Sequence, residues 1–338
     1  MAALAGGWDG KRELSTAKLL IFDDSRKGMR WEPLPDLPGA VVNPALVGDA
    51  EGRLLCCGGK RGGDPLREVA AWSAAAAAAW EPWPQLRTAR DGARAVRLHD
   101  GRVLVMGGSR GATDLASCEM FDATAGRWVG APSMCCARRS FGAAVMPDGR
   151  VVVAGGFGGA GSGVGGDTAG GRGDVAMEVH VSRTPLAQPR DRLASAEIFD
   201  PSANSWSLLP EMATLRDGCA LCVLGEQEFG VFGGCGNGSY QRDSESFSFT
   251  TGAWSALPPM SIGRAGCAGV LGPPVPTAPC GLPIVVGGAC DENPAGVELL
   301  KSMECFVPSG DPAEPGEWQG KPEMDVARQW AGLCQYQP

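Results

Sequence analysis

Histidine and tyrosine are almost absent from this chain, with two of each among 338 residues. Histidine is the side chain that most often transfers protons or binds metals near neutral pH. With so few of them, neither a Ser-His-Asp nor a Cys-His pairing can be built from the sequence. We therefore expect no enzymatic activity, no cofactor and no metal site.

Long apolar runs and an excess of basic residues are also missing. No stretch approaches the roughly 18 apolar residues of a membrane span, and Met1 to Gly10 lacks the basic start and apolar core of a signal peptide. The formal net charge is −8 and the pI about 5.0, which disfavours nucleic acid or an anionic membrane as the main partner. We expect no nucleic-acid partner and no membrane insertion.

Cysteine, in contrast, is abundant, with an odd number of thirteen. Most of the cysteines fall in expected strands and not at paired spacings. Cys219 and Cys222 imitate a metal or redox pair, but residues three apart in a strand point to opposite faces. Reduced core thiols predict an intracellular, cytoplasmic protein.

Glycine pairs recur along the chain and mark an internal repeat. Successive pairs are separated by 48 to 54 residues, except for one interval of 78. Each unit carries one tryptophan at an equivalent position, and an arginine follows ten residues after five of the six tryptophans. The pairs are Gly6-Gly7, Gly58-Gly59, Gly107-Gly108, Gly155-Gly156, Gly233-Gly234 and Gly287-Gly288.

Between these landmarks the sequence predicts short strands. Runs such as Val103-Leu104-Val105-Met106 are too short for helices, and Asp100-Gly101 and Asp148-Gly149 are typical hairpin turns. Each unit therefore contains four antiparallel strands, a to d, counted from the arginine onward. Because such a sheet cannot bury both faces alone, six copies predict an all-β, six-bladed β-propeller. We expect one domain over residues 1–338, with a Gly-rich insertion at 157–192 in the b-to-c loop of blade 4.

The first unit lacks a strand a, and the missing strand is expected at the other end of the chain. Ala2 to Gly7 is typical of the end of a strand b, whereas Trp330 to Gln335 follows the last arginine. We predict that this C-terminal segment completes the first blade and closes the ring without an open sheet edge.

These units resemble kelch repeats. Residues 117–122 (Ser-Cys-Glu-Met-Phe-Asp), Trp128, Met134, Arg138 and residues 153–156 (Val-Ala-Gly-Gly) are close to the family consensus, and the similarity covers nearly the whole chain. In similar kelch substrate adaptors of ubiquitin ligases, the d-to-a and b-to-c loops contact a bound peptide. The resemblance therefore implies a protein-binding module, adaptor or scaffold. Unlike those adaptors, this protein is expected to have no upstream helical oligomerisation or cullin-binding module, or to obtain that link from another subunit.

In a meander the d-to-a and b-to-c loops emerge on one face, so the repeated arginines are predicted to form a basic floor there. Guanidinium groups bind carboxylates and phosphates in bidentate fashion, which suggests an acidic or phosphorylated partner segment. The alternative that the arginines belong to the scaffold stays open. The residues expected at the site are Lys60, Arg61, Arg90, Asp91, Ser109, Arg110, Arg138, Arg139, Ser140, Arg216, Asp217, Asn237, Tyr240, Arg264, Arg328 and Gln329.

Two other functions are also compatible with the sequence. One is a structural subunit held permanently in a larger assembly, and the other a small-molecule enzyme, such as a sugar epimerase, that uses the central channel. A copper-radical oxidase, which some kelch propellers resemble, is disfavoured because His99 and Tyr240 are expected on opposite faces. In the insertion, Val175 to Val181 is expected to form a small extra strand or to dock on a partner.

Overall fold

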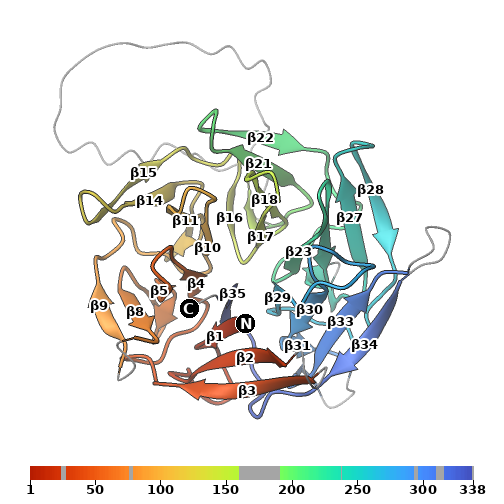
Figure 1. The fold of residues 1–338 in the computed structure, drawn as a ribbon, viewed down its shortest axis with the longest axis horizontal. Helices are drawn as coiled ribbons and strands as arrows, with labels where there is room; N and C mark the ends of the chain where they lie inside the picture. Colours follow the sequence, from red (N-terminus) through yellow and green to blue (C-terminus); the bar gives the residue numbers. More distant parts are fainter. Residues whose placement is uncertain are drawn as a thin grey trace.

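The computed structural model describes residues 1–23, 28–75, 79–159, 191–236, 238–292, 296–309 and 316–336. In these residues six four-stranded antiparallel sheets are arranged around a central axis (Figure 1). The prediction of an all-β propeller with four antiparallel strands in each blade is confirmed. None of the described residues forms a helix long and apolar enough to cross a membrane.

The blades follow one another around the ring in the order of the sequence. From the axis outward, blade 1 contains β35 (Gly332–Gln335), β1 (Ala2–Ala5), β2 (Ala17–Asp23) and β3 (Gly28–Leu34). Blade 2 contains β4 (Ala45–Gly48), β5 (Arg53–Cys57), β8 (Val69–Ser73) and β9 (Glu81–Trp83). Blade 3 contains β10 (Arg94–Arg97), β11 (Val103–Met106), β14 (Cys118–Asp122) and β15 (Arg127–Ala131).

The second half of the chain repeats this pattern. Blade 4 contains β17 (Gly142–Val145), β18 (Val151–Ala154), β21 (Ala196–Asp200) and β22 (Ser205–Leu209). Blade 5 contains β23 (Ala220–Gly225), β24 (Glu228–Phe232), β27 (Ser244–Ser248) and β28 (Ala253–Leu257). Blade 6 contains β29 (Ala268–Leu271), β30 (Pro283–Val286), β33 (Met303–Val307) and β34 (Glu317–Lys321).

The two ends of the chain share blade 1, as predicted. Strand β35 pairs antiparallel with β1, with Leu4 opposite Leu333 and Ala3 opposite Cys334. Beyond this strand, Tyr336 is buried, its hydroxyl donates to the Gly52 carbonyl oxygen at 3.0 Å, and its ring lies 6.2 Å from that of Trp72. The C-terminal segment therefore joins blade 1 and also contacts blade 2.

Short ribbons extend from the b-to-c loops. Isolated bridges connect them to the d-to-a loops, for example Asp91 to Ser109 and Asp217 to Cys235, so both loop types share one side of the ring, which we call the hairpin face. The two-stranded ribbons are β6–β7 (Lys60–Arg61, Asp64–Pro65), β12–β13 (Ser109–Arg110, Thr113–Asp114), β25–β26 (Cys235–Gly236, Ser239–Tyr240) and β31–β32 (Ala289–Cys290, Glu298–Leu299).

In blade 4 the equivalent ribbon has three strands, β16 (Ala137–Arg139), β19 (Phe157–Gly159) and β20 (Asp191–Arg192). Strands β19 and β20 are the two ends of the 157–192 insertion and pair with each other. The rest of the insertion, including the strand expected at Val175 to Val181, lies outside the described residues.

The glycine pairs lie where the chain turns away from strand b against the neighbouring loop. Gly155 and Gly156 have φ of 68° and 102°. A Cβ on Gly155 would lie 2.6 Å from the Arg216 carbonyl oxygen, and one on Gly156 would lie 2.7 Å from that of Arg139. Only glycine combines this backbone conformation with such close contacts, which explains why the pair recurs in every blade.

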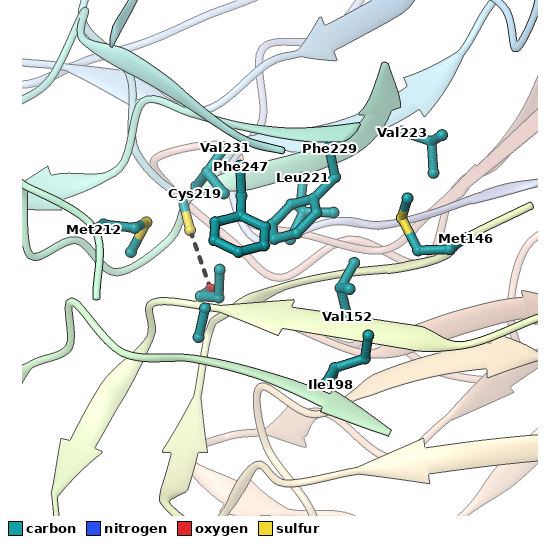
Figure 2. Packing of buried hydrophobic residues seen from close by; sticks show 12 residues of the cluster. Met146, Val152, Ile198, Met212, Cys219, Leu221, Val223, Phe229, Val231 and Phe247 are labelled. Atoms are coloured by element: carbon teal, nitrogen blue, oxygen red, sulfur yellow. Dashed lines mark hydrogen bonds between the residues drawn. The ribbon is translucent and has the colours of Figure 1, made fainter. Parts of the chain in front are cut away.

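Apolar side chains from adjacent blades pack together in the wedges between sheets. Figure 2 shows Val152 and Ile198 of blade 4 packed against Phe229 and Phe247 of blade 5. Cys219 lies in this cluster, whereas Cys222 contributes to the cluster between blades 5 and 6. The two cysteines therefore point to opposite faces of one strand, and the expected reason against a metal pair is confirmed.

The repeated tryptophans tie each blade to the one before it. The indole N–H of Trp128 donates to the Pro84 carbonyl oxygen at 2.8 Å, and Trp80, Trp206, Trp254 and Trp318 make the equivalent bond. Trp31 differs, because its buried Nε1 has no partner. Its neighbour in register is Leu20, whereas that of Trp128 is Phe121.

This difference gives a matched test of the inter-blade bond. Trp128→Phe removes the bond to Pro84 along with part of the ring, whereas Trp31→Phe removes only ring. We expect Trp128→Phe to lower the free energy of unfolding by about 1 kcal/mol more than Trp31→Phe. Urea denaturation of both variants measures the difference, and equal losses would show that the bond contributes nothing.

Candidate functional site

The five repeated arginines are buried and do not form an accessible floor. Arg90, Arg138, Arg216, Arg264 and Arg328 are each at most 2% exposed. The expectation that these side chains ring an open surface is therefore wrong, and the scaffold alternative describes them. A partner on the hairpin face cannot reach their guanidinium groups.

Arg138 shows what these arginines do. Its Nη1 donates to the carbonyl oxygens of Gly155 and Ser195, and its Nη2 forms an ion pair with Glu197 at 2.7 Å. Glu197 in turn accepts the backbone N–H groups of Cys135 and Cys136. The pair thus ties the loop between two blades to strands b and c of the following blade.

The same ion pair recurs in the other units. Arg90, Arg216 and Arg264 pair with Glu119, Glu245 and Glu304 at 3.0, 2.7 and 2.5 Å. Arg328 is the exception, since it donates to the Gly6 carbonyl oxygen and to the Thr16 hydroxyl. The glutamates at one repeat position thus hold four of the five arginines.

Two residues after each of the five arginines, and at Asn43 in the unit that has Val41 instead, the backbone forms a closed ring of hydrogen bonds around the axis. Each N–H donates to the carbonyl oxygen of the equivalent residue in the neighbouring unit, over 2.7 to 3.2 Å. All six residues have positive φ, between 55° and 70°. The members of this axial ring, in donor-to-acceptor order, are Asn43, Trp330, Gly266, Gly218, Ser140 and Gly92.

Side chains of the axial ring fill its interior. The Asn43 amide donates to the Ser140 hydroxyl at 3.3 Å. The Trp330 indole lies over Gly218 and Gly266, so close that a Cβ on Gly218 would be 2.7 Å from it. The axis is therefore covered on the hairpin face. The expected site residue Ser140 is buried here and serves the ring.

Charged residues around the axial ring form ion pairs with one another. Lys60 pairs with Asp91 at 3.7 Å, Arg139 with Asp114 at 2.8 Å, and Arg192 with Asp217 at 2.7 Å. Farther out, Arg61 pairs with Glu68 at 3.1 Å. The hairpin face is thus a mosaic of both signs and not the basic surface that the sequence predicts.

The cost of burying the carboxylates of two aspartates on this face is only partly offset by neighbouring cations. Burial raises the pKa of Asp91 above its usual value, although Lys60 opposes the shift, and burial also raises that of Asp217 against Arg192. In addition, Asp91 Oδ1 is buried without a hydrogen-bond partner. Loss of hydration disfavours the charged carboxylate, so both groups are suited to accept a further donor.

The remaining expected residues differ in their accessibility. Ser109 is buried and exchanges backbone hydrogen bonds with Asp91, and Gln329 bridges to Trp8 through its backbone. Arg110 is exposed, and Tyr240 is half-buried. Asn237 lies outside the described residues. Arg110 and Tyr240 are therefore accessible on the ribbons of blades 3 and 5 without serving the ring.

Arg139 and Phe157 show a contact that the sequence reading did not anticipate. The guanidinium carbon lies 4.6 Å from the centre of the Phe157 ring, at the start of the insertion. Such stacking favours a fixed position for the cation. Among the described residues, no group of three or more potential ligands could hold a metal ion.

Comparison with known proteins agrees with this fold. The family described as Kelch motif matches residues 93–134, and no curated protein matches the chain in sequence. A solved structure titled "Structure of YjhT" is similar over 88% of both chains, with a TM-score of 0.64 and 14% sequence identity. The chain thus carries a Kelch motif at residues 93–134 and has the β-propeller fold.

Proposed function

We propose that this protein is an interaction module that recognises a partner segment on the hairpin face. The observation that supports this proposal is the contrast between adjacent positions. The arginine is the same and buried in five units, whereas the next residue differs: Asp91, Arg139, Asp217, Ala265 and Gln329. A rigid frame that presents different side chains at equivalent places is suited to recognising one sequence of partner groups.

The chemistry of the face narrows the class of partner. The proposal of an acidic or phosphorylated segment rests on two kinds of cation. Arg110 is exposed and has no ion pair with another described residue, and Lys60, Arg139 and Arg192 are paired. Asp91 also has a buried oxygen without a donor. We therefore propose a segment that brings carboxylate or phosphate groups to the cations and a hydrogen-bond donor to the axis.

The test compares the two faces of one blade. Crosslinking and mass spectrometry in an extract of the native source identify partners linked through Lys60, and purified partners are then titrated against variants. Arg110→Glu is expected to weaken binding by about tenfold or more, since a charge-assisted contact is lost and a repulsive charge added. Arg127→Glu, an exposed arginine of the c-to-d turn on the opposite face, is the matched control.

Each outcome has a distinct meaning. Loss of affinity in Arg110→Glu but not in Arg127→Glu supports recognition on the hairpin face. A stable partner that neither variant affects contradicts it and favours a permanent structural subunit attached by its rim.

A further inference from the structure

Behind the axial ring, a channel follows the axis between the innermost strands of the six blades. A cavity of about 60 Å³ lies next to the ring, and a second of about 310 Å³ follows it. The two share wall residues, among them Ala95, Ala143 and Gly269, so they are consecutive sections of one channel. The ring covers one end, while Arg97 and Gln335 are exposed at the other.

One charged side chain interrupts the otherwise small and apolar wall of the inner section, whereas Arg97 lines the outer section near its mouth. In each blade, one residue at an equivalent position lines the inner section. It lies four residues after the buried repeated arginine, or after Val41 in the unit that has no such arginine. Blade 3 has Arg94 there, whereas the other five blades have only alanine or glycine, namely Ala45, Gly142, Ala220, Ala268 and Gly332. Arg94 thus lies inside the channel.

The Arg94 guanidinium has no counter-charge within the described part of the chain. Its hydrogen bond to the Ala93 carbonyl oxygen is long, at 3.4 Å, and neither section of the channel is lined by a carboxylate. The neighbouring thiols of Cys219 and Cys267 are neutral, since burial raises the pKa of both, that of Cys267 to about 12. Burial also lowers the pKa of Arg94, which reflects an unfavourable, uncompensated cation.

The outer section of the channel has a different character. Its wall is formed mainly by aliphatic side chains, including Val47, Val96, Val145, Val223 and Leu333. A volume of this size is at the lower end of that of small-molecule sites, which combine an apolar wall with few polar groups. The channel therefore offers one cation at its closed end and an apolar chamber in front of it.

We propose that the channel binds a small organic monocarboxylate, with its carboxylate on Arg94 and its apolar body in the outer section. One guanidinium balances one negative charge, whereas a phosphate dianion would keep an uncompensated charge away from water. The ligand enters from the face opposite the hairpin face. The site is thus independent of the proposed partner recognition, and either can fail alone.

Calorimetric titration of the full chain tests this site. The probes are butanoate, hexanoate and octanoate, with hexan-1-ol as the uncharged molecule of matched length and inorganic phosphate as the anion without an apolar body. We expect affinity to rise with chain length, and hexanoate to bind about tenfold or more tightly than hexan-1-ol. Weak or undetectable phosphate binding is expected as well.

Two variants assign the site to Arg94. Arg94→Ala gives blade 3 the residue type of the other blades, so the fold should persist, and hexanoate affinity should fall about tenfold or more. Arg94→Gln removes the charge at similar length and answers the question if the alanine variant misfolds. Arg127→Ala, at an exposed arginine of the same blade that lines neither section of the channel, should bind hexanoate as the unmodified protein does. Unchanged affinity in both Arg94 variants, or no carboxylate binding by the unmodified protein, would overturn the proposal.

Discussion

Replacement of Arg138 by methionine is expected to lower the free energy of unfolding by about 3–5 kcal/mol. The substitution keeps much of the apolar stem but leaves Glu197 as a charge that is 0% exposed and has lost its ion pair. It also removes the donors to the Gly155 and Ser195 carbonyl oxygens. Chemical denaturation followed by tryptophan fluorescence measures the loss.

Two further variants identify the cause. Arg127→Met changes an exposed arginine of the neighbouring blade and should leave stability within error. The double variant Arg138→Met/Glu197→Leu removes both charges and should recover part of the loss, because the penalty arises from the unpaired charge. If Arg138→Met alone is as stable as the unmodified protein, the arginine is not part of the scaffold.

The chain without residues 332–338 is expected to be unfolded at room temperature, so that heating produces no cooperative unfolding transition. The truncation deletes strand β35, and β1 then becomes an exposed edge facing the channel. It also removes Tyr336, whose ring packs beside Trp72. Differential scanning calorimetry of the truncated chain checks this, and an unchanged melting temperature would rule out closure by the C-terminal strand.

A milder change separates packing from strand pairing. Tyr336→Ala should cost about 3–5 kcal/mol through the cavity it creates. Tyr336→Phe should cost about 1 kcal/mol, since it loses only the bond to the Gly52 carbonyl oxygen. Equal effects of the two would show that the ring contributes nothing to closure.

The repeat was sufficient to predict the blades because its signals are local. Gly155-Gly156 marks the end of a strand, Asp148-Gly149 marks a hairpin, and Trp206 recurs at one register. The closing strand was predictable because the first unit lacks a strand a. These features depend on local backbone conformation and on the spacing of apolar residues, and both can be read from the sequence.

The accessibility of the arginines was not predictable in the same way. A recurring Arg138 on a loop has the same spacing whether it points outward or inward, and only its position beside Glu197 decides this. Nothing in the spacing of the repeated glutamates indicates that they pair with the arginines. These glutamates are Glu119, Glu197, Glu245 and Glu304. No sequence motif marks Arg94 as a channel residue. It is unusual only because the equivalent positions of other blades hold alanine or glycine, such as Ala45 and Gly142.

The axial ring has an electrostatic consequence. Its six N–H to O=C vectors run in the same sense around the axis, so their components in the plane of the ring cancel. A helix end, in contrast, presents a partial charge that attracts ions because its dipoles point the same way. The in-plane components of the ring therefore attract no ion to any one side of the axis.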